Sequence, residues 1–148
     1  MGRVLGRGNA STERVLVALL RSSNLTGWRR HLPLPGNPDF TFPSLRIVVF
    51  VDGCFWHSCP RHLRLPVANR DYWVRKIDRN RRRDRRTTRE LRAGGWRVIR
   101  IWEHELRSPS DKQRVLSRIV RAVGEARRGD GGRRAAGRSD MHDARRLR

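Results

Sequence analysis

The stretch from Val48 to His62 most constrains the fold of this chain. It runs from an apolar, β-branched segment typical of a buried strand into a loop with two cysteines, two histidines and two adjacent aromatic residues. Such a loop can hold a metal ion, a catalytic histidine and a stacking wedge together. Asp39 lies upstream, beside a second short apolar segment. A carboxylate on one strand and reactive groups at the end of the next strand is how metal-dependent nucleases hold divalent ions.

The charge of the chain makes a phosphate-rich partner the leading expectation. The 148 residues contain 35 Lys and Arg against 14 Asp and Glu, a formal net charge of +21. Only Lys76 and Lys112 are lysines, so the other basic residues are arginines, which favour bidentate phosphate contacts and base stacking. Arginine codons of a GC-rich genome and a basic tail are alternative sources of the charge. We expect a nucleic-acid partner, because the charge exceeds what solubility requires.

Length and composition predict one domain, without a membrane partner. No apolar run approaches the ~20 residues of a membrane-spanning helix, and the first residues contain no hydrophobic segment of signal-peptide length. We therefore expect a cytoplasmic, nucleoid-associated monomer. Cys54 and Cys59 could form a small disulfide loop, but in a reducing compartment with histidines alongside, metal binding is favoured.

The pattern along the chain predicts a flexible arm over residues 1–10, a domain over residues 11–124, and a basic, disordered tail over residues 125–148. Within the domain, turn residues and apolar periodicity separate helices from strands. The predicted elements are a helix capped by Ser11 or Thr12 that ends near residues 22–24, strands over residues 39–42 and 46–51 that form a hairpin, a helix over residues 69–93, a strand over residues 96–102, and a helix that opens at Ser110 or Asp111.

Two helices carry apolar stripes. The final helix has Val115, Leu116, Ile119, Val120 and Val123 on its predicted buried face. The stripe of the long arginine-rich helix consists of Trp73, Ile77, Asn80, Asp84, Thr87 and Leu91. An acid on this inward stripe has two interpretations. Asp84 either forms an internal salt bridge to a neighbouring arginine, or it orients a histidine of the active site.

Several motifs together resemble the very short patch repair (Vsr) endonucleases over roughly residues 11–106. They are Pro38-Asp39-Phe40, the run from Phe50 to His57, Asn80 with Arg83 to Arg86, Gly95 to Val98, and Trp102-Glu103. The resemblance implies an α/β, restriction-endonuclease-like (PD-(D/E)XK-related) three-layer fold with a mixed central sheet and a structural zinc site. It also implies Mg²⁺-dependent nicking on the 5′ side of the thymine in a T:G mismatch, which starts repair of deaminated 5-methylcytosine.

The resemblance assigns four catalytic residues. Asp39 matches the metal-bridging aspartate, His57 the catalytic histidine, and Asp84 the acid paired with that histidine. Glu13 matches the acid on the first helix. Chemically, Asp39 is a hard oxygen ligand for Mg²⁺, and His57 oriented by Asp84 could activate a water molecule. Each has an alternative: Glu13 favours the helix dipole, Asp39 is a turn residue after proline, and His57 is a zinc ligand.

The cysteines and histidines predict a structural Zn²⁺ site. A closed site needs four Cys or His ligands, and Cys54, Cys59 and His62 are local. The fourth must be His57 or a distant residue. The resemblance implies His104, which leaves His57 for catalysis. The alternative is a pair of free cysteines with surface histidines.

The adjacent aromatics Phe55 and Trp56 match the residues that intercalate beside the mismatch in the family. A wedge selects for defects because unstacking is least costly at a mispair. Core packing of one of the two aromatics is the alternative.

The chain departs from the family pattern at three positions. Val51 stands where many members have a threonine, so it can offer Mg²⁺ only its backbone carbonyl. Gly2 stands where an apolar wedge residue would align, which puts strict mismatch preference in doubt. Asp52 replaces a histidine of some members; it could assist metal binding, but strand alternation turns it away from Val51.

We therefore expect a Mg²⁺-dependent mismatch endonuclease that acts on double-stranded DNA, with mismatch-repair proteins as further partners. Two alternatives stay open. One is a Vsr-related homing or defence endonuclease that cuts without a mismatch. The other is a non-catalytic, zinc-stabilised DNA-binding module whose acids are structural.

Overall fold

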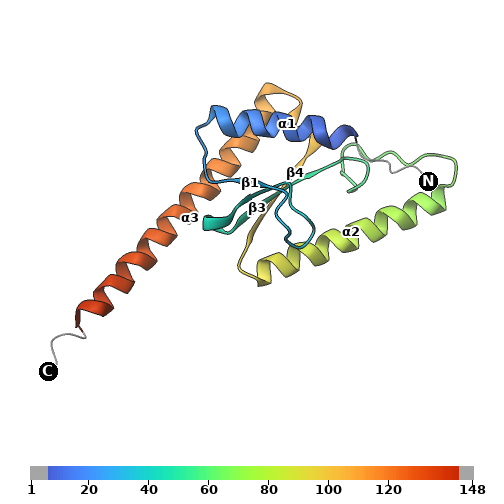
Figure 1. The fold of residues 1–148 in the computed structure, drawn as a ribbon. Helices are drawn as coiled ribbons and strands as arrows, with labels where there is room; N and C mark the ends of the chain where they lie inside the picture. The colour runs from blue at the N-terminus through green and yellow to red at the C-terminus, as the bar shows by residue number, and fades with distance from the viewer. Residues whose placement is uncertain (1–6, 144–148) are drawn as a thin grey trace.

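A four-stranded mixed sheet between helices forms the body of the protein (Figure 1). The computed structural model describes residues 7–143, and the side chains of residues 10–130. Its elements are α1 (Arg7–Ser22), β1 (Arg29–Arg30), β2 (Phe40–Phe42), the 3₁₀ turn η1 (Pro43–Leu45), β3 (Ile47–Asp52), α2 (Arg70–Ala93), β4 (Arg97–Trp102), the 3₁₀ turn η2 (Glu103–Leu106) and α3 (Pro109–Asp143). The predicted α/β class with a mixed sheet is confirmed. None of the described helices is both long enough and apolar enough to cross a membrane.

The strands lie in the order β1-β2-β3-β4. The predicted hairpin is confirmed: β2 pairs antiparallel with β3, with Phe40 opposite Val49, and η1 makes the turn. β3 pairs in parallel with β4 from Ile47 opposite Arg97 to Asp52 opposite Trp102. A parallel pair needs a crossover connection, and α2 provides it. Both strands therefore end at the same edge of the sheet.

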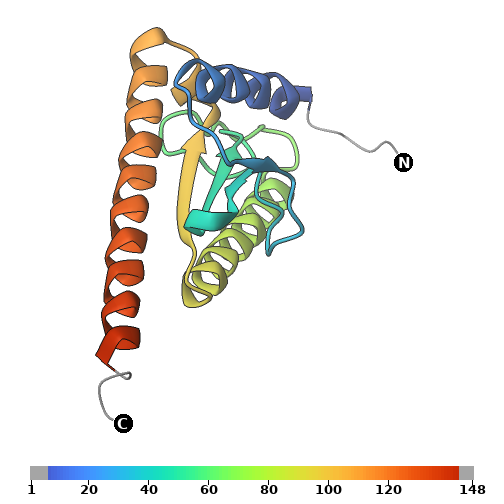
Figure 2. The same cartoon turned by 60° about the vertical axis from the view of Figure 1, so that its left-hand side comes forward.

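Helices cover both faces of the sheet, which gives three layers (Figures 1 and 2). α1 and α3 cover one face, and α2 covers the other. Alternate residues of β3 point to opposite faces, so this strand is buried throughout. The larger core includes Leu16, Leu20, Val49, Val51, Ile99, Ile101, Val115 and Ile119. The smaller core, under α2, contains Val48, Phe50 and Leu91.

The predicted stripe of α2 is confirmed. Ile77 and Leu91 are buried, and Trp73, Asn80, Asp84 and Thr87 are half-buried. The helix begins within one residue of the predicted start and ends at Ala93 as predicted. Gly95 follows with a φ of 82°, a left-handed conformation that glycine adopts without strain.

The start of α1 and the strand β1 differ from the sequence predictions. α1 begins at Arg7, so Ser11 and Thr12 lie inside the helix and do not begin it. A cap preference is worth about 1 kcal/mol, which a favourable helical context can override. β1 has only two residues, paired with β2. A strand this short leaves no periodic pattern in the sequence, since its pairing is decided by tertiary contacts.

α3 also differs from its prediction. Ser108 caps it, because the Asp111 N–H donates to Ser108 Oγ at 3.1 Å, and Pro109 is the first helical residue. Val120 is exposed, although it was predicted to face the core. The helix continues to Asp143, where disorder was expected from residue 125. Residues 125–128 after Gly124 are good helix formers, and extending an existing helix needs no new nucleation. Residues 1–6, with Gly2, and residues 144–148 lie outside the described residues.

We predict that Ile119→Ala lowers the free energy of unfolding by about 2–5 kcal/mol, because a buried isoleucine leaves a cavity. Ile119 is 0% exposed and its neighbour Val120 is 44% exposed. The control Val120→Ala should change it by less than about 0.5 kcal/mol. Urea denaturation of both variants measures the difference, and similar losses would contradict the packing of α3.

Candidate active site and metal centre

Asp39 is fixed at the end of β3. Its Oδ2 accepts a hydrogen bond from the Val51 backbone N–H at 2.6 Å. β2 begins at Phe40, opposite Val49, so strand pairing stops short of Val51 and leaves this N–H to the side chain of Asp39. The half-buried carboxylate is thus held beside the last residues of the central strand.

Glu13 joins Asp39 from α1. It is 7% exposed, and ligand atoms of Glu13, His31 and Asp39 all lie within 4.8 Å of one another, a group that could hold a metal ion. Arg30 Nη2 lies 2.6 Å and His31 Nε2 lies 3.3 Å from Glu13 Oε2. The sequence analysis missed Arg30 and His31. The only sequence feature that could have indicated them is a pair of basic residues shortly before the turn that leads to Asp39.

The environment of Asp39 suits a cation. Burial raises the pKa of Asp39 to about 6, and the nearby charge of Glu13 adds to this, although the Val51 N–H opposes it. Two confined carboxylates repel each other when both are ionised. A bound divalent cation would offset this repulsion, and carboxylate oxygens are the ligands that Mg²⁺ prefers.

His57 and Asp84 meet on the α2 side of β3. His57 Nδ1 lies 2.6 Å from Asp84 Oδ2. The loop after β3 carries the histidine, and the inward stripe of α2 carries the acid. The structure therefore brings together the two residues that the sequence analysis paired. Since the histidine uses Nδ1 for Asp84, its Nε2 is left to face other groups.

The two residues shift each other's pKa. Burial by itself lowers the pKa of His57, but the hydrogen bond to Asp84 and the charges of Asp52 and Asp84 outweigh it and raise the pKa. Burial raises the pKa of Asp84, but the bond to His57 and the charge of Arg100 outweigh it and lower the pKa. Both shifts favour a charged pair.

Asp52 and Arg100 support this pair, and the sequence analysis did not connect them. Arg100 Nη1 donates to both carboxylate oxygens of Asp52 at 2.9 Å, and its Nε donates to Thr88 Oγ1 at 3.2 Å. Arg100 Nη2 lies 4.0 Å from Asp84 Oδ1, and His57 Nδ1 lies 3.7 Å from Asp52 Oδ1. An arginine in the middle of an apolar strand was the available signal. Asp52 points away from the Asp39 side, as strand alternation predicted.

Cys54, Cys59, His62 and His104 form a second group that could hold a metal ion, with ligand atoms all within 4.8 Å. His104 Nδ1 lies 3.3 Å from Cys54 Sγ and 3.5 Å from Cys59 Sγ, and His62 Nδ1 lies 3.5 Å from Cys59 Sγ. Zinc bonds of about 2.3 Å to sulfur and about 2.0 Å to nitrogen, in tetrahedral geometry, separate S and N ligands by about 3.5 Å. The spacing therefore fits Zn²⁺, and His57 is outside the group.

The thiols of this group favour a bound cation. Both cysteines are free and buried. Burial raises the pKa of the Cys54 thiol to about 11, and the neighbouring Cys59 adds to this. A metal ion would supply the positive charge that two adjacent thiolates need, so binding and deprotonation are coupled.

Phe55 and Trp56 belong to an exposed aromatic cluster. Trp56 is 36% exposed and Phe55 is half-buried, so neither is a buried core residue. Both contact Trp73, with ring centroids 5.4 Å and 6.0 Å away, respectively. Lys76 Nζ lies 5.3 Å from the centroid of the Trp56 ring. The sequence analysis did not foresee that α2 adds Trp73 and Tyr72 to this cluster.

Acids, a histidine pair and exposed aromatics thus gather at one end of β3. Asp39 binds the backbone of Val51, and His57 lies beside Asp52, the next residue. The acids of the first group come from the α1 side of the strand, and the histidine pair lies on its α2 side. Paired carboxylates that could hold a metal ion, and an oriented histidine at the same end of one strand, are groups that metal-assisted hydrolysis uses.

Comparison with known proteins agrees with this chemistry. The family model for the DNA mismatch endonuclease Vsr matches residues 1–62. The DNA mismatch endonuclease Vsr of Escherichia coli (strain K12) is 37% identical over 106 residues, 71% of this chain and 68% of the relative. The type II nicking enzyme V.XorIIP of Xanthomonas oryzae pv. oryzae is 43% identical over 99 residues, 66% of this chain and 73% of the relative.

A third relative has a higher sequence identity over a shorter stretch. The type II nicking enzyme V.NaeI of Lentzea aerocolonigenes is 52% identical over 68 residues, 46% of this chain and 41% of that enzyme. Two relatives are nevertheless matched over more than two thirds of their length, and both carry names of DNA-cutting enzymes. The resemblance seen in the sequence is therefore confirmed, and the chain is a DNA endonuclease that belongs to the Vsr family.

Proposed function

We propose that this endonuclease uses Mg²⁺ to nick double-stranded DNA on the 5′ side of the thymine in a T:G mismatch, the step that starts repair of deaminated 5-methylcytosine. The observation that carries the proposal is that the Glu13–Asp39 group and the His57–Asp84 pair lie at the same end of β3, where Asp39 contacts Val51 and His57 lies beside Asp52, next to exposed Trp56. The three-layer arrangement supports a restriction-endonuclease-like fold. The Escherichia coli relative is a DNA mismatch endonuclease, and this similarity supports the proposed substrate.

Asp39, Glu13 and the backbone carbonyl of Val51 would hold Mg²⁺. Bound there, the ion supplies positive charge that polarises the scissile phosphate and stabilises the departing oxygen. The residues fit it, because the two confined carboxylates provide hard oxygen donors and carry repulsion that a cation offsets. Arg30 and His31 keep Glu13 in place from the solvent side.

His57 acts as the general base. Its Nδ1 is hydrogen-bonded to Asp84, so Nε2 is the atom that takes the proton from the attacking water. Asp84 fixes the ring orientation and stabilises the imidazolium that forms. Arg100 neutralises Asp52, which keeps a second carboxylate from competing for His57.

Phe55 and Trp56 provide the mismatch test. An aromatic wedge that opens a base step meets less resistance at a wobble pair, which converts mispairing into a rate difference. Trp73 and Lys76 support the wedge from α2. Gly2 stands where a second, apolar wedge residue would align, so discrimination between T:G and T:A pairs depends on Phe55 and Trp56 alone.

Zn²⁺ held by Cys54, Cys59, His62 and His104 has a structural role. It ties the loop after β3 to the turn after β4, and this loop carries Phe55, Trp56 and His57. The proposed setting is the cytoplasm, with a monomer acting on DNA and mismatch-repair proteins as further partners.

The alternative is an endonuclease that cuts without a mismatch. It would use the same acids and histidine. The substitution of Val51 for threonine and of Gly2 for an apolar residue favours this alternative, because both depart from the pattern that accompanies mismatch repair. Matched and mismatched duplexes separate the two functions.

We predict that Asp39→Asn lowers the nicking rate at least about 100-fold while DNA affinity stays within about threefold. The reason is that Asp39 binds the metal, whereas affinity comes from arginine–phosphate contacts. Gel assays with and without added Mg²⁺ and anisotropy titrations with a labelled duplex measure the two quantities. Wild-type nicking by this variant, or by wild-type protein in excess chelator, would refute the metal assignment.

We predict that the protein nicks a T:G duplex faster than its T:A counterpart, and that Trp56→Ala reduces this ratio more than it reduces binding to T:A DNA. The wedge, and not the arginine contacts, reads the mispair. Tyr72→Ala is the matched control, since Tyr72 is a neighbouring aromatic that is 46% exposed. Equal rates on T:G and T:A duplexes in several sequence contexts would favour the alternative function.

We predict about one zinc ion per chain that survives dialysis, because two thiolates and two imidazoles complete a tetrahedral shell. His104→Ala and Cys59→Ser should lose the ion and destabilise the fold. His57→Ala should keep the ion and lose nicking. Elemental analysis and thermal melting test this, and zinc loss in His57→Ala alone would reverse the roles of the two histidines.

A further inference from the structure

We infer that the groove between α2 and the end of β4 binds the phosphodiester backbone of one DNA strand where that strand leaves the nick site. The groove has a volume of about 580 Å³. His57 and Asp84 lie at its inner end, and arginines of α2 form one wall. Its lining includes His57 and Asp84 but neither Glu13 nor Asp39. The inference rests on the proposed function in one respect, because the strand in the groove is taken to be the DNA strand that the enzyme nicks.

The arginine wall is a regular ladder. Arg81, Arg85, Arg89 and Arg92 all line the groove. Spacings of four, four and three residues put them on one face of α2, with steps of about 6 Å along the helix. Within the described part of the chain, none of the four has a carboxylate partner within salt-bridge distance, whereas Arg82 pairs with Asp78 at 2.9 Å. Uncompensated cations in a row attract a polyanion.

The acids of the groove cannot satisfy this wall. Asp52 is already held by Arg100, with contacts of 2.9 Å, and Asp84 by His57, at 2.6 Å. Five arginines, Arg100 included, therefore face two carboxylates that are both engaged. The four arginines of the ladder are exposed to solvent, so an anionic ligand can reach them.

Ser58 supplies an independent sign of a ligand. It lines the groove across from the ladder, in a left-handed backbone conformation with a φ of 59°. Its Oγ is buried and has no hydrogen-bond partner among the described residues. Buried hydroxyls without partners are rare in folded proteins. A change of the Ser58 side-chain rotamer would present this hydroxyl to a phosphate oxygen in the groove.

The size and the opposite wall of the groove favour a single strand. A volume of this size suits a small ligand or a few nucleotides and not the width of a duplex. Pro60 and half-buried Trp102 give the opposite wall an apolar surface. Aromatic rings next to a basic track are a general means of binding single strands, because bases stack on them without sequence preference. His57 at the inner end connects the groove to the reaction site.

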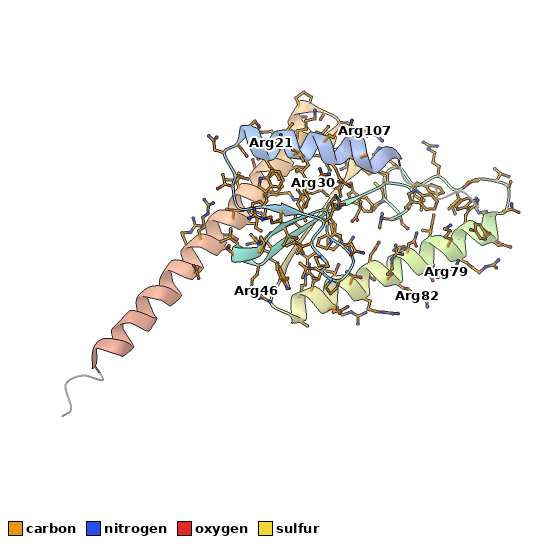
Figure 3. All side chains as sticks on the ribbon, viewed as in Figure 1. Arg21, Arg30, Arg46, Arg79, Arg82 and Arg107 are labelled. Atoms are coloured by element: carbon orange, nitrogen blue, oxygen red, sulfur yellow. The ribbon has the colours of Figure 1, made fainter. Side chains whose placement is uncertain are left out.

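The test compares two triple variants of the full chain that lose the same charge from the same helix. The groove variant is Arg81→Gln, Arg85→Gln and Arg89→Gln. The control is Arg75→Gln, Arg79→Gln and Arg86→Gln, whose spacing puts them on the solvent side of α2; Figure 3 shows Arg79 pointing away from the sheet. Affinity for a labelled T:G duplex with a preformed nick on the 5′ side of the thymine is measured by anisotropy from 0.05 to 0.3 M salt without divalent metal, so no further strand is cut.

The groove variant should bind at least about tenfold more weakly than the control variant, and its log–log salt slope should fall by about 2 to 3, the number of lost phosphate contacts. Ser58→Ala should weaken binding about fivefold, as expected for one lost hydrogen bond, with an unchanged melting temperature. Equal losses in both triple variants would show a diffuse basic field and overturn the groove. Unchanged affinity of the groove variant would overturn it as well.

Two further experiments distinguish a nucleic-acid ligand from an acidic peptide, and the mismatch proposal from the groove proposal. An oligoglutamate of equal charge should compete far less than a single-stranded oligonucleotide, and equal competition would assign the groove to acidic peptides instead. Wild-type protein that binds through the groove but nicks T:G and T:A duplexes equally would sink the mismatch proposal and leave the groove intact. Wild-type mismatch nicking with normal binding by the groove variant would sink the groove alone.

Discussion

The parallel pairing of β3 with β4 is the constraint on which the site depends. Because the two strands run side by side to Asp52 and Trp102, the loops that follow them leave the sheet at one edge. The cysteine-containing loop after β3 thereby meets His104 in the turn after β4. The crossover that a parallel pair requires is α2, and its return across the sheet carries Asp84 over His57. Both the histidine pair and the Cys/His group therefore follow from one strand pairing.

Charge compensation divides the acids of the site into two kinds. Asp52 and Asp84 each have a cationic or hydrogen-bonding partner, which is what buried carboxylates need to remain ionised. The Asp39 carboxylate accepts a hydrogen bond only from the Val51 backbone N–H among the described contacts, lies beside Glu13, another acid, and has its pKa raised to about 6 by burial. The same logic separates the arginines, because those that are paired stabilise the fold and those of the groove face outward without counter-charges. Unbalanced charge thus marks the two places that we propose to bind a metal ion and DNA.

The long elements of the fold could be predicted from the sequence. The 24 residues of α2 and the buried run of β3 carry periodic signals that local propensity and burial both support. The short elements could not. β1 consists of two arginines, and its existence is decided by pairing with β2. Val120 was placed on the wrong face of α3, because an apolar residue at the edge of a stripe becomes buried only if another element covers it.

The sequence by itself determined the groups on which the proposed chemistry rests: the acids Glu13 and Asp39, the expected pairing of His57 with Asp84, and two thiols with histidines at ligand-like spacing. Residue type and order are sufficient for these, since they define a motif. The structure brings His104 to the two thiols, as the resemblance implied, and only the tertiary structure decided that Arg100 pairs with Asp52 and that four arginines of α2 face a groove. The physical reason is distance. These contacts join residues from separate elements, and they arise only when strand pairing and helix packing bring the elements together.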